Sequence, residues 1–287
     1  MFDLFEKINE FLKETIIGVI RENLASMLID INDKVGTVAG EVGKTPSAWN
    51  SEVFSFIQSI NESVVLPVAA MILTAILCIE LIQSVVNKNN LHETDTFDFF
   101  KYIIKMWIAI WLVSHAFEFS MAIFDVAASL INAAAGVVGT SANITSGDFK
   151  AMVDALKTEE IGKLIVLMIE TSLVKLSLTI LSILITVILY GRMIEIYIYT
   201  SVCAIPFSTM GNRDWSSIGM NFIKSLGALG LQGLFILIFL GIYAILVKTI
   251  NFTDIHASTL QVLAYALILG IMMMKSGSIA KSILNAN

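Results

Sequence analysis

Several ionisable side chains stand inside long apolar stretches of this sequence, where an unpartnered charge would be costly. Among them are Glu80, Lys105, Glu118, Asp125, Lys175, Arg192 and Glu195. Such residues can line a watered path or a proton relay, or they can join helices within a bundle or between subunits. We favour the joining role, because lipid cannot satisfy polar groups that neighbouring helices can.

The clearest polar stripe lies in residues 102–131. At about 100° per residue, several side chains fall within roughly 40° of one line: Ser114, Glu118, Asp125, Ser129 and Asn132. Trp107 and Trp111 head the same stripe, and indoles favour the membrane interface. Carboxylates on one intramembrane face should avoid lipid, so the stripe predicts a polar packing surface.

Depth and spacing predict three ion pairs among the buried charges. They join Lys175 to Glu118, Glu80 to Lys105, and Arg192 to Glu195. The first two would link antiparallel helices at the same depth, and the third lies along one helix at i,i+3. Thr171, Thr179, Ser182 and Thr186 continue a polar stripe through Lys175.

No motif for catalysis, phosphate binding or zinc binding is present. His92, His115 and His256 lie in three separate segments, so a metal site built from several histidines is not expected. Cys78 and Cys203 each lie in an apolar run, which is typical of buried thiols rather than of a disulfide framework. The net charge of −6 argues against a nucleic-acid binder. We expect no catalytic residues, no cofactor and no metal.

The elements that position these residues are apolar enough to cross a membrane. The 287 residues are 56% hydrophobic and 15% charged, against about 45–50% and 25% in soluble domains. Residues 164–211 form a nearly unbroken apolar run, which as one helix would be about 70 Å long beside a bilayer core of roughly 30 Å. The run must cross once and continue beyond, or turn back near Tyr190 and Gly191. The fold class is therefore all-α and polytopic, with about five spans, or six if the run crosses twice.

The five spans are predicted at residues 64–86, 102–131, from about 164 onward, 220–247 and 258–274. The fourth span has a glycine face that permits close approach by a neighbouring helix, made by Gly219, Gly227, Gly230, Gly233 and Gly241. We expect this face and the N-terminal helix to make contacts between subunits.

Residues 2–31 have the 3–4 spacing of an amphipathic helix. Its polar face is not rich in Lys and Arg, as that of an interfacial helix usually is, so we expect a protein partner, such as a second copy, on its apolar side. Gly36, Gly40, Gly43 and Pro46 predict a flexible connector. The chain then divides into residues 1–60 and a transmembrane domain of residues 61–287, whose polar loop at residues 133–163 should hold a short helix near residues 149–156.

The distribution of Lys and Arg sets the expected orientation. Five spans with the N-terminus outside would place eight basic residues on the cytoplasmic side and four outside, the N-terminal segment apart. Six spans with the N-terminus inside also agree with the charges. Both arrangements put the C-terminus in the cytoplasm, and no secretory signal opens the chain.

Residues 192–233 carry a more specific pattern, RMIEIYIYTSVCAIPFSTMGNRDWSSIGMNFIKSLGALGLQG. Its marked positions are Arg192, Glu195, Tyr197, Pro206, Trp215, Gly219, Lys224, Gln232 and Gly233. In these positions the chain resembles the TrbL/VirB-type polytopic membrane subunits of type IV secretion systems, particularly the version on conjugative elements of Gram-positive bacteria. The resemblance covers about residues 60–280, and the central loop is shorter than in relatives with a large periplasmic domain.

The resemblance implies a non-enzymatic, oligomeric scaffold or channel subunit of the cytoplasmic (inner) membrane that mediates conjugative DNA transfer. Its partners would be other type IV secretion subunits, including the secretion ATPases and the coupling protein, further copies of itself and the lipid bilayer. Contact with relaxase-bound single-stranded DNA would be indirect, because the sequence shows no basic groove for a strand. An ion-coupled secondary transporter using Glu118, Asp125 and Lys175 stays open as the alternative.

Overall fold

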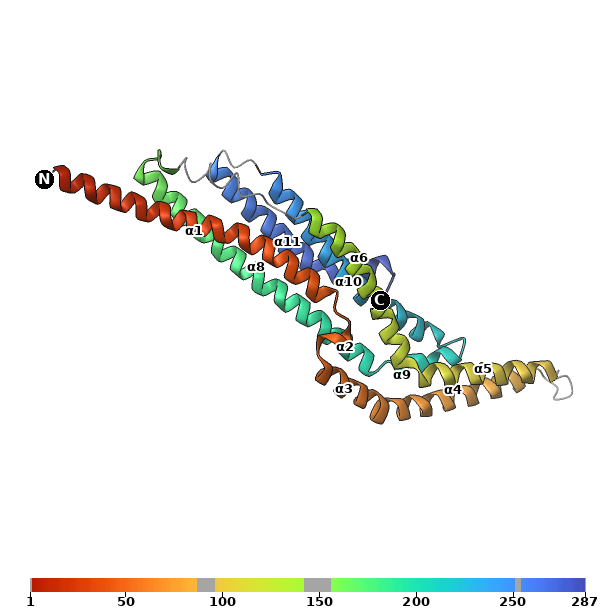
Figure 1. Ribbon diagram of the computed structural model, residues 1–287. Helices are drawn as coiled ribbons and strands as arrows, with labels where there is room; N and C mark the ends of the chain where they lie inside the picture. Colours follow the sequence, from red (N-terminus) through yellow and green to blue (C-terminus); the bar gives the residue numbers. More distant parts are fainter. Residues whose placement is uncertain (1, 87–95, 142–155, 251–253, 287) are drawn as a thin grey trace. The chain divides into compact units, whose positions relative to one another are not determined.

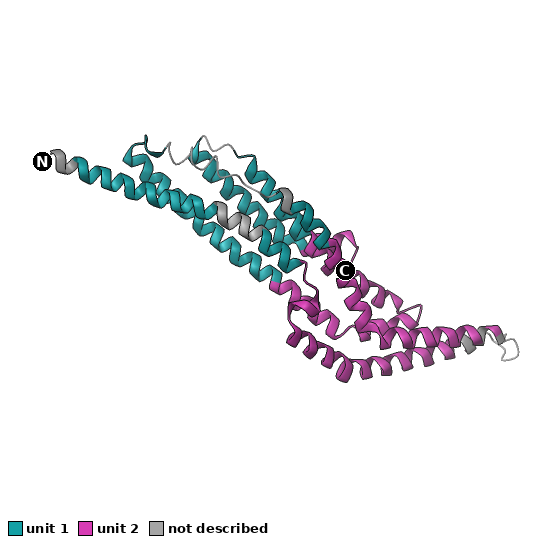
Figure 2. Ribbon diagram, viewed as in Figure 1, with its two compact units in different colours: residues 1–42, 131–189, 235–276 teal, residues 43–130, 190–234, 277–287 magenta. Residues whose placement is uncertain are grey.

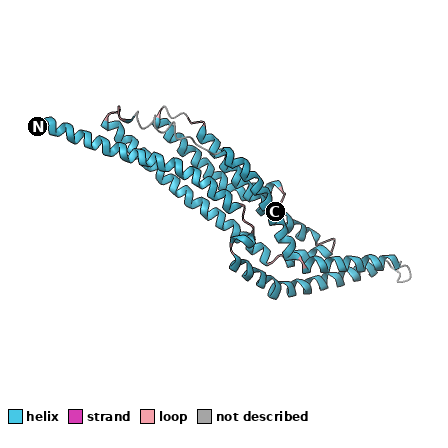
Figure 3. Cartoon of the chain, viewed as in Figure 1, coloured by secondary structure: helices cyan, strands magenta, loops and turns pink. Residues whose placement is uncertain are grey.

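The protein is built from helices throughout the residues that its computed structural model describes, which are 2–86, 96–141, 156–250 and 254–286 (Figure 1). No strand occurs among these residues (Figure 3). The helices are α1 (Phe2–Val42), α2 (Pro46–Trp49), α3 (Ser51–Ile60), the π-helix η1 (Asn61–Val65), α4 (Leu66–Val86), α5 (Thr96–Ser114), α6 (Ala116–Ser141), α8 (Ile161–Ser201), α9 (Ala204–Ser208), the 3₁₀-helix η3 (Thr209–Gly211), α10 (Ser216–Lys248) and α11 (Ile255–Ile283). The predicted all-α fold class is confirmed.

Five helical stretches within the described residues are long and apolar enough to cross a membrane: Ser51–Gln83, Ala116–Val138, Ile161–Ser201, Ser216–Lys248 and Ile255–Ile283. The third of them is α8, a single helix of 41 residues that passes through Tyr190 and Gly191 without a turn. A helix of that length measures roughly 60 Å, so α8 takes the first of the two predicted courses, one crossing with an apolar extension. The structure thus favours five spans over six.

The first two spans differ from the prediction. The first begins earlier than residue 64, since α3, η1 and α4 are continuous from Ser51. The second, predicted as one helix over residues 102–131, is divided at His115 into α5 and α6. Helix α5 lies along α4, where Tyr102 Oη donates to the carbonyl of Leu77 at 2.9 Å. The apolar period continues through His115, so the sequence does not mark this bend, which comes from the packing of α5 on α4 and α9.

Helix α1 is longer than the predicted amphipathic helix and reaches Val42. Gly36 and Gly40 lie inside it, so the flexible connector predicted from these glycines is wrong at this point. A glycine costs a helix about 1 kcal/mol, and the burial of Val38 and Val42 opposes that cost. The apolar side of α1 lies partly against its own chain rather than a partner, since Ile20 is fully buried.

Two compact units make up the chain (Figure 2). Unit 1 comprises residues 1–42, 131–189 and 235–276, and unit 2 comprises residues 43–130, 190–234 and 277–287. The expected division into residues 1–60 and 61–287 does not coincide with these units and stays a prediction. The helix expected near residues 149–156 falls almost wholly outside the described residues.

In unit 1, α1 and α11 both lie on α8. Asn23 Nδ2 of α1 donates to Ser172 Oγ of α8 at 3.0 Å. A Cβ added at Gly270 of α11 would lie 3.0 Å from Leu181 Cδ1, so these helices approach closely. This packing buries the middle of α1, which the sequence alone assigned to a partner.

Apolar clusters form in two places among the described residues of unit 2. In the first, α4, α5 and α9 meet around Leu73, Ala109 and Phe207. In the second, α6, α8 and α10 meet around Phe124, Ile196 and Leu226, all 2% exposed or less. These clusters fix which faces of α6 and α10 point inward, and hence which side chains are left on the surface.

Candidate functional site

The polar stripe predicted on α6 lies on an exposed face of unit 2. Glu118, Asp125 and Ser129 are exposed on this helix, whereas Phe124 and Ala127 on its other side are buried. Neither carboxylate makes a hydrogen bond or an ion pair with a described residue of unit 2. On a helix apolar enough to cross a membrane, such a face has to be covered by protein or reached by water.

Ser114, predicted to lie on the same stripe, belongs instead to α5. It is exposed, but the bend at His115 separates it from the carboxylates of α6. The bend is accompanied by a contact between His115 Nδ1 and the carbonyl of Trp111 at 2.9 Å. The polar face of α6 therefore begins at Glu118.

Glu80 and Lys105 form an ion pair between α4 and α5. Their side chains are 21% and 40% exposed, so the pair lies at the edge of the hairpin rather than in its core. Oε2 of Glu80 is buried and has no hydrogen-bond partner within the described part of the chain. The two residues lie together as the depth argument predicted, and their contact ties the two arms of the hairpin.

Arg192 and Glu195 each bond to another helix of unit 2. Arg192 is 5% exposed, and its Nε donates to the carbonyl of Leu229 on α10 at 3.0 Å. Glu195 Oε1 accepts from Lys281 Nζ of α11 at 3.4 Å. The sequence predicted a pair along α8 from these residues, which stays a prediction, and it missed both bonds between helices.

Lys175, the predicted partner of Glu118, is half-buried in unit 1. Glu118 belongs to unit 2, which is described separately from unit 1, so the pairing of Lys175 with Glu118 stays a prediction. Beside Lys175, Thr171 Oγ1 accepts from Asn23 Nδ2 at 3.4 Å, and Thr179 Oγ1 donates to the carbonyl of Lys175 at 3.0 Å. Part of the predicted polar stripe of α8 therefore holds α1.

Sequence reasoning missed the joint at which α8 ends. Asn61 of η1 is 3% exposed, and its Nδ2 donates to the carbonyls of Thr200 at 3.4 Å and Ser201 at 3.0 Å. These are carbonyls of the last turn of α8, which no longer have donors within the helix. The signal that could have found the joint is an asparagine inside an apolar helical stretch, because polar side chains in membrane spans usually join helices.

The other positions of the sequence pattern also lie in unit 2. Tyr197 is 3% exposed, and its Oη donates at 2.6 Å to the carbonyl at the start of α2. Pro206 lies in α9, and Trp215, 46% exposed, directly precedes α10. On α10 itself, Gln232 is buried and Lys224 is half-buried.

The glycine face of α10 is occupied by neighbours within the chain. A Cβ added at Gly219 would lie 2.6 Å from Pro206 O, and one added at Gly227 would lie 3.1 Å from Leu284 Cδ1. A Cβ added at Gly230 would lie 2.9 Å from Ala127 Cβ, and one added at Gly241 would lie 3.0 Å from Val138 Cγ2. Gly233 is buried. The expected close helix packing is present, but its partners are intramolecular. A contact between subunits therefore needs another surface.

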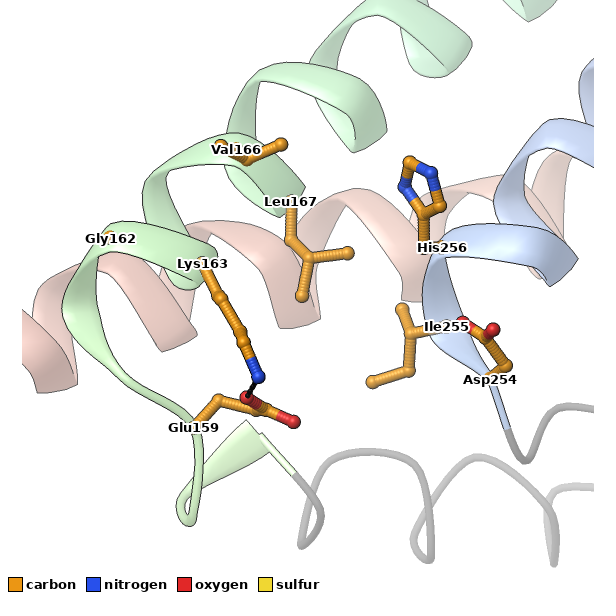
Figure 4. A pocket seen from close by; sticks show the side chains of 8 residues that line it. All are labelled: Glu159, Gly162, Lys163, Val166, Leu167, Asp254, Ile255 and His256. Atoms are coloured by element: carbon orange, nitrogen blue, oxygen red, sulfur yellow. Dashed lines mark hydrogen bonds and ion pairs between the residues drawn. The ribbon is translucent and has the colours of Figure 1, made fainter.

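Unit 1 contains a pocket of about 540 Å³ where α8 and α11 begin (Figure 4). Its charged lining is held by bonds within the chain. Lys163 Nζ lies 3.1 Å from Glu159 Oε2, and Asp254 Oδ1 accepts from the amide of Ala257 at 3.2 Å. His256 Nδ1, on the wall of the pocket, lies 2.5 Å from Glu170 Oε2. Of these contacts, the one between His256 and Glu170 connects α11 to α8, and the sequence did not predict it.

The described residues contain no cluster of three His, Cys, Asp or Glu side chains that could hold a metal ion. Both cysteines are free thiols. Cys203 is buried as predicted, and its Sγ accepts from Asn61 Nδ2 at 3.4 Å. Cys78 is exposed, so the prediction of a buried thiol is wrong there.

One of three comparisons with known proteins identifies a family. A family model described as TrbL/VirB6 plasmid conjugal transfer like protein matches residues 31–204. The match includes α6, α8 and the hairpin of α4 and α5. A search of curated proteins and a search of solved structures each gave no match.

Proposed function

The chain belongs to the TrbL/VirB6 plasmid conjugal transfer like family, and from this premise we propose that it assembles with further copies of itself as a scaffold or channel in conjugative DNA transfer. Membership implies a subunit of a type IV secretion apparatus that associates with other components of that machine. The family is one of structural subunits rather than an enzyme class. With five apolar helices among its described residues, the chain is suited to a multi-pass membrane subunit.

The exposed carboxylates of α6 carry the oligomeric part of this proposal. Glu118 and Asp125 lie on a helix apolar enough to span a membrane, and no described residue pairs with them. A charge near the middle of a bilayer costs about 2.5–3.5 kcal/mol on insertion scales. A second subunit placed against α6 removes that cost and needs no conformational change within the chain.

The remaining roles follow from the machine rather than from this chain's own chemistry. We place the protein in the cytoplasmic membrane with its C-terminus in the cytoplasm, where Lys275 and Lys281 lie near the end of the last span. The secretion ATPases and the coupling protein would supply energy. The protein would contact the relaxase-bound strand only indirectly, since the net charge is −6.

Deletion of the gene from a donor cell tests the proposal. Conjugation should fall to background and return when the chain is supplied in trans, and a tagged copy should recover both an untagged copy and other secretion subunits. A donor that conjugates normally without the chain contradicts the proposed function.

The alternative of an ion-coupled transporter makes a different prediction at the same residues. Glu118→Gln with Asp125→Asn would abolish a carrier's transport while leaving assembly intact. In a scaffold, the same pair should lower conjugation only as far as it lowers recovery of the second copy. Ser129→Ala on the same face is the matched control, since it removes a polar group without removing charge.

A further inference from the structure

Two faces of unit 2 carry charges that no described residue neutralises. The first is the exposed face of α6 with Glu118 and Asp125, and the second is the edge of α10 with Lys224, which is half-buried. None of these three side chains makes a hydrogen bond or ion pair with a described residue of unit 2. Elsewhere in the unit, Glu80 and Glu195 each have a lysine partner.

The α6 face points away from the helix that carries Lys224. At about 100° per residue, four exposed side chains lie within about 60° of one another: Glu118, Ala122, Asp125 and Ser129. Ala127 lies roughly opposite them and marks the side toward α10, since a Cβ added at Gly230 would lie 2.9 Å from its Cβ. Helix α6 itself therefore stands between its carboxylates and α10.

Lys224 in turn points away from α6. It projects about 120° from Gly230 around the axis of α10, and Gly230 is the residue that approaches α6. Lys224 and the carboxylates thus occupy different faces of one unit, which is why they do not neutralise each other within the chain.

The charges of the two faces nevertheless lie at matching levels. Gly230 approaches Ala127, and Gly241 approaches Val138, so α6 and α10 run parallel with an offset of 103 residues in both contacts. Lys224 is then level with residue 121, which is three residues from Glu118 and four from Asp125. At 1.5 Å per residue these separations are about 5 and 6 Å along the axis, within reach of a lysine side chain.

We propose that a second copy packs the Lys224 edge of its α10 against the α6 face, formed by Glu118, Ala122, Asp125 and Ser129. Rotation about an axis along the membrane normal keeps residues at the same depth, so a lysine level with both carboxylates in one copy is level with them in the next. Ala122 and Ser129 are small and let the two helices approach. The proposal rests on the proposed oligomeric function and names the two surfaces that build it.

The contact is head-to-tail. Each copy offers Lys224 to one neighbour and its carboxylates to the other, which builds a ring when the rotation closes. An isologous contact between two α6 faces would instead place carboxylate against carboxylate, and like charges at close range oppose association. Charge complementarity therefore selects the second copy's α10 as the occupant of the α6 face.

Disulfide cross-linking between differently tagged copies tests the geometry in membranes. In a Cys78→Ser background, one copy carries Ser129→Cys and the other carries Leu231→Cys, which lies level with residue 128 on the Lys224 side of α10. We expect a cross-linked dimer when both copies are present and none when either is present alone. A dimer formed by Ser129→Cys with itself, or a cross-link only to a different protein, overturns the proposal.

A charge swap tests the pairing itself by the same cross-link. Glu118→Lys with Asp125→Lys in every copy, or Lys224→Glu in every copy, should lower cross-linking about tenfold or more, since like charges then meet. Mixing the two kinds of copy restores opposite charges at each contact between unlike copies, and cross-linking between them should return to within about threefold of the unswapped level, a difference of less than 1 kcal/mol. Swapped copies that do not recover on mixing, although each remains folded by tryptophan fluorescence, overturn the pairing.

The cross-linking experiment and the gene-deletion experiment can fail independently of each other. If the donor needs the chain for conjugation and copies co-purify without the Ser129–Leu231 cross-link, the surfaces are wrong and the subunit role stands. If the donor conjugates without the chain, the function fails whatever the cross-links show.

Discussion

Removing the side-chain amide of Asn61 should destabilise unit 2 more than any other single loss of a polar group on the first span. Asn61 is 3% exposed and donates to Thr200 O, Ser201 O and Cys203 Sγ, at 3.4, 3.0 and 3.4 Å. The two carbonyls close the last turn of α8, where the helix supplies no further donors. Asn61→Ala would leave both carbonyl oxygens without the amide donor in a buried, apolar environment.

The size of the effect follows from the number of bonds and the volume lost. Net hydrogen bonds contribute about 0.5–1.5 kcal/mol each, and leaving a buried acceptor unpaired costs about 1–3 kcal/mol. We expect Asn61→Ala to cost roughly 2–4 kcal/mol in total, including the small cavity that the shorter side chain leaves. At about 2–4 °C per kcal/mol this lowers the melting temperature by roughly 5–15 °C.

Asn61→Asp separates hydrogen bonding from volume, since the two side chains are nearly isosteric. An ionised carboxylate can only accept, so it would face two carbonyl oxygens and a thiol with no amide donor, and the loss should exceed that of alanine. Protonation supplies one O–H donor, so the destabilisation by aspartate should be smaller at acid pH and grow as the pH rises.

Thermal unfolding in detergent, followed by tryptophan fluorescence, measures these losses. All four tryptophans lie in unit 2, and Trp49 packs against Tyr197 with ring centroids 6.0 Å apart. Gln58→Ala is the matched control, because it removes an amide from the same helical stretch that bonds only to exposed Glu62. A melting temperature for Asn61→Ala within 1–2 °C of the Gln58→Ala value would refute the reasoning, since such a shift corresponds to about 1 kcal/mol or less.

Three further predictions follow, two measured by the same thermal unfolding and one by labelling in intact membranes. Tyr102→Phe removes the bond that α5 makes to α4 and should cost about 0.5–1.5 kcal/mol, read as a melting shift of a few degrees, and an unchanged melting temperature contradicts the hairpin contact. Gly230→Ala forces a Cβ to 2.9 Å from a neighbouring Cβ and should destabilise by about 1–3 kcal/mol, whereas Gly191→Ala points into open space and should gain up to about 1 kcal/mol. Equal signs for the two changes would refute the packing argument. Cysteines at Ser146, which lies outside the described residues, and at Ser216 should be labelled from opposite sides of the membrane, and labelling from one side would rule out α8 as a single crossing.

The spans could be predicted because their signal is local, whereas the bend at His115 could not. An apolar run longer than about 18 residues has few alternatives to a membrane helix, and residues 164–211 satisfy this condition by themselves. The helical period of residues 102–131 is equally local and continues through His115. This stretch is divided because Ala109 and Val113 pack against α4 and α9. That contact involves residues distant in the sequence.

The candidate site likewise has features that the sequence could predict and features that it could not. Helical spacing placed Glu118 and Asp125 on one face of α6, because the angle between residues of one helix depends only on their separation. Spacing within α8 did not reveal that Arg192 donates to Leu229 on α10 or that Glu195 accepts from Lys281 on α11. The identity of a partner on another helix depends on which helices become neighbours, and that information is not local.

Intramembrane polar groups of this chain fall into two classes that only the structure separates. Asn61, Arg192 and Glu195 bond to other helices of unit 2, so their polarity is accounted for by the fold of one chain. Glu118 and Asp125 are carboxylates like Glu195, but they lie on the outer side of α6, where no described residue of unit 2 pairs with them. A polar residue that joins helices of one unit is accounted for by folding, whereas one that stays exposed on a span and unpaired within its unit is a candidate for contact with another subunit. The second class therefore marks the surface on which assembly should be tested.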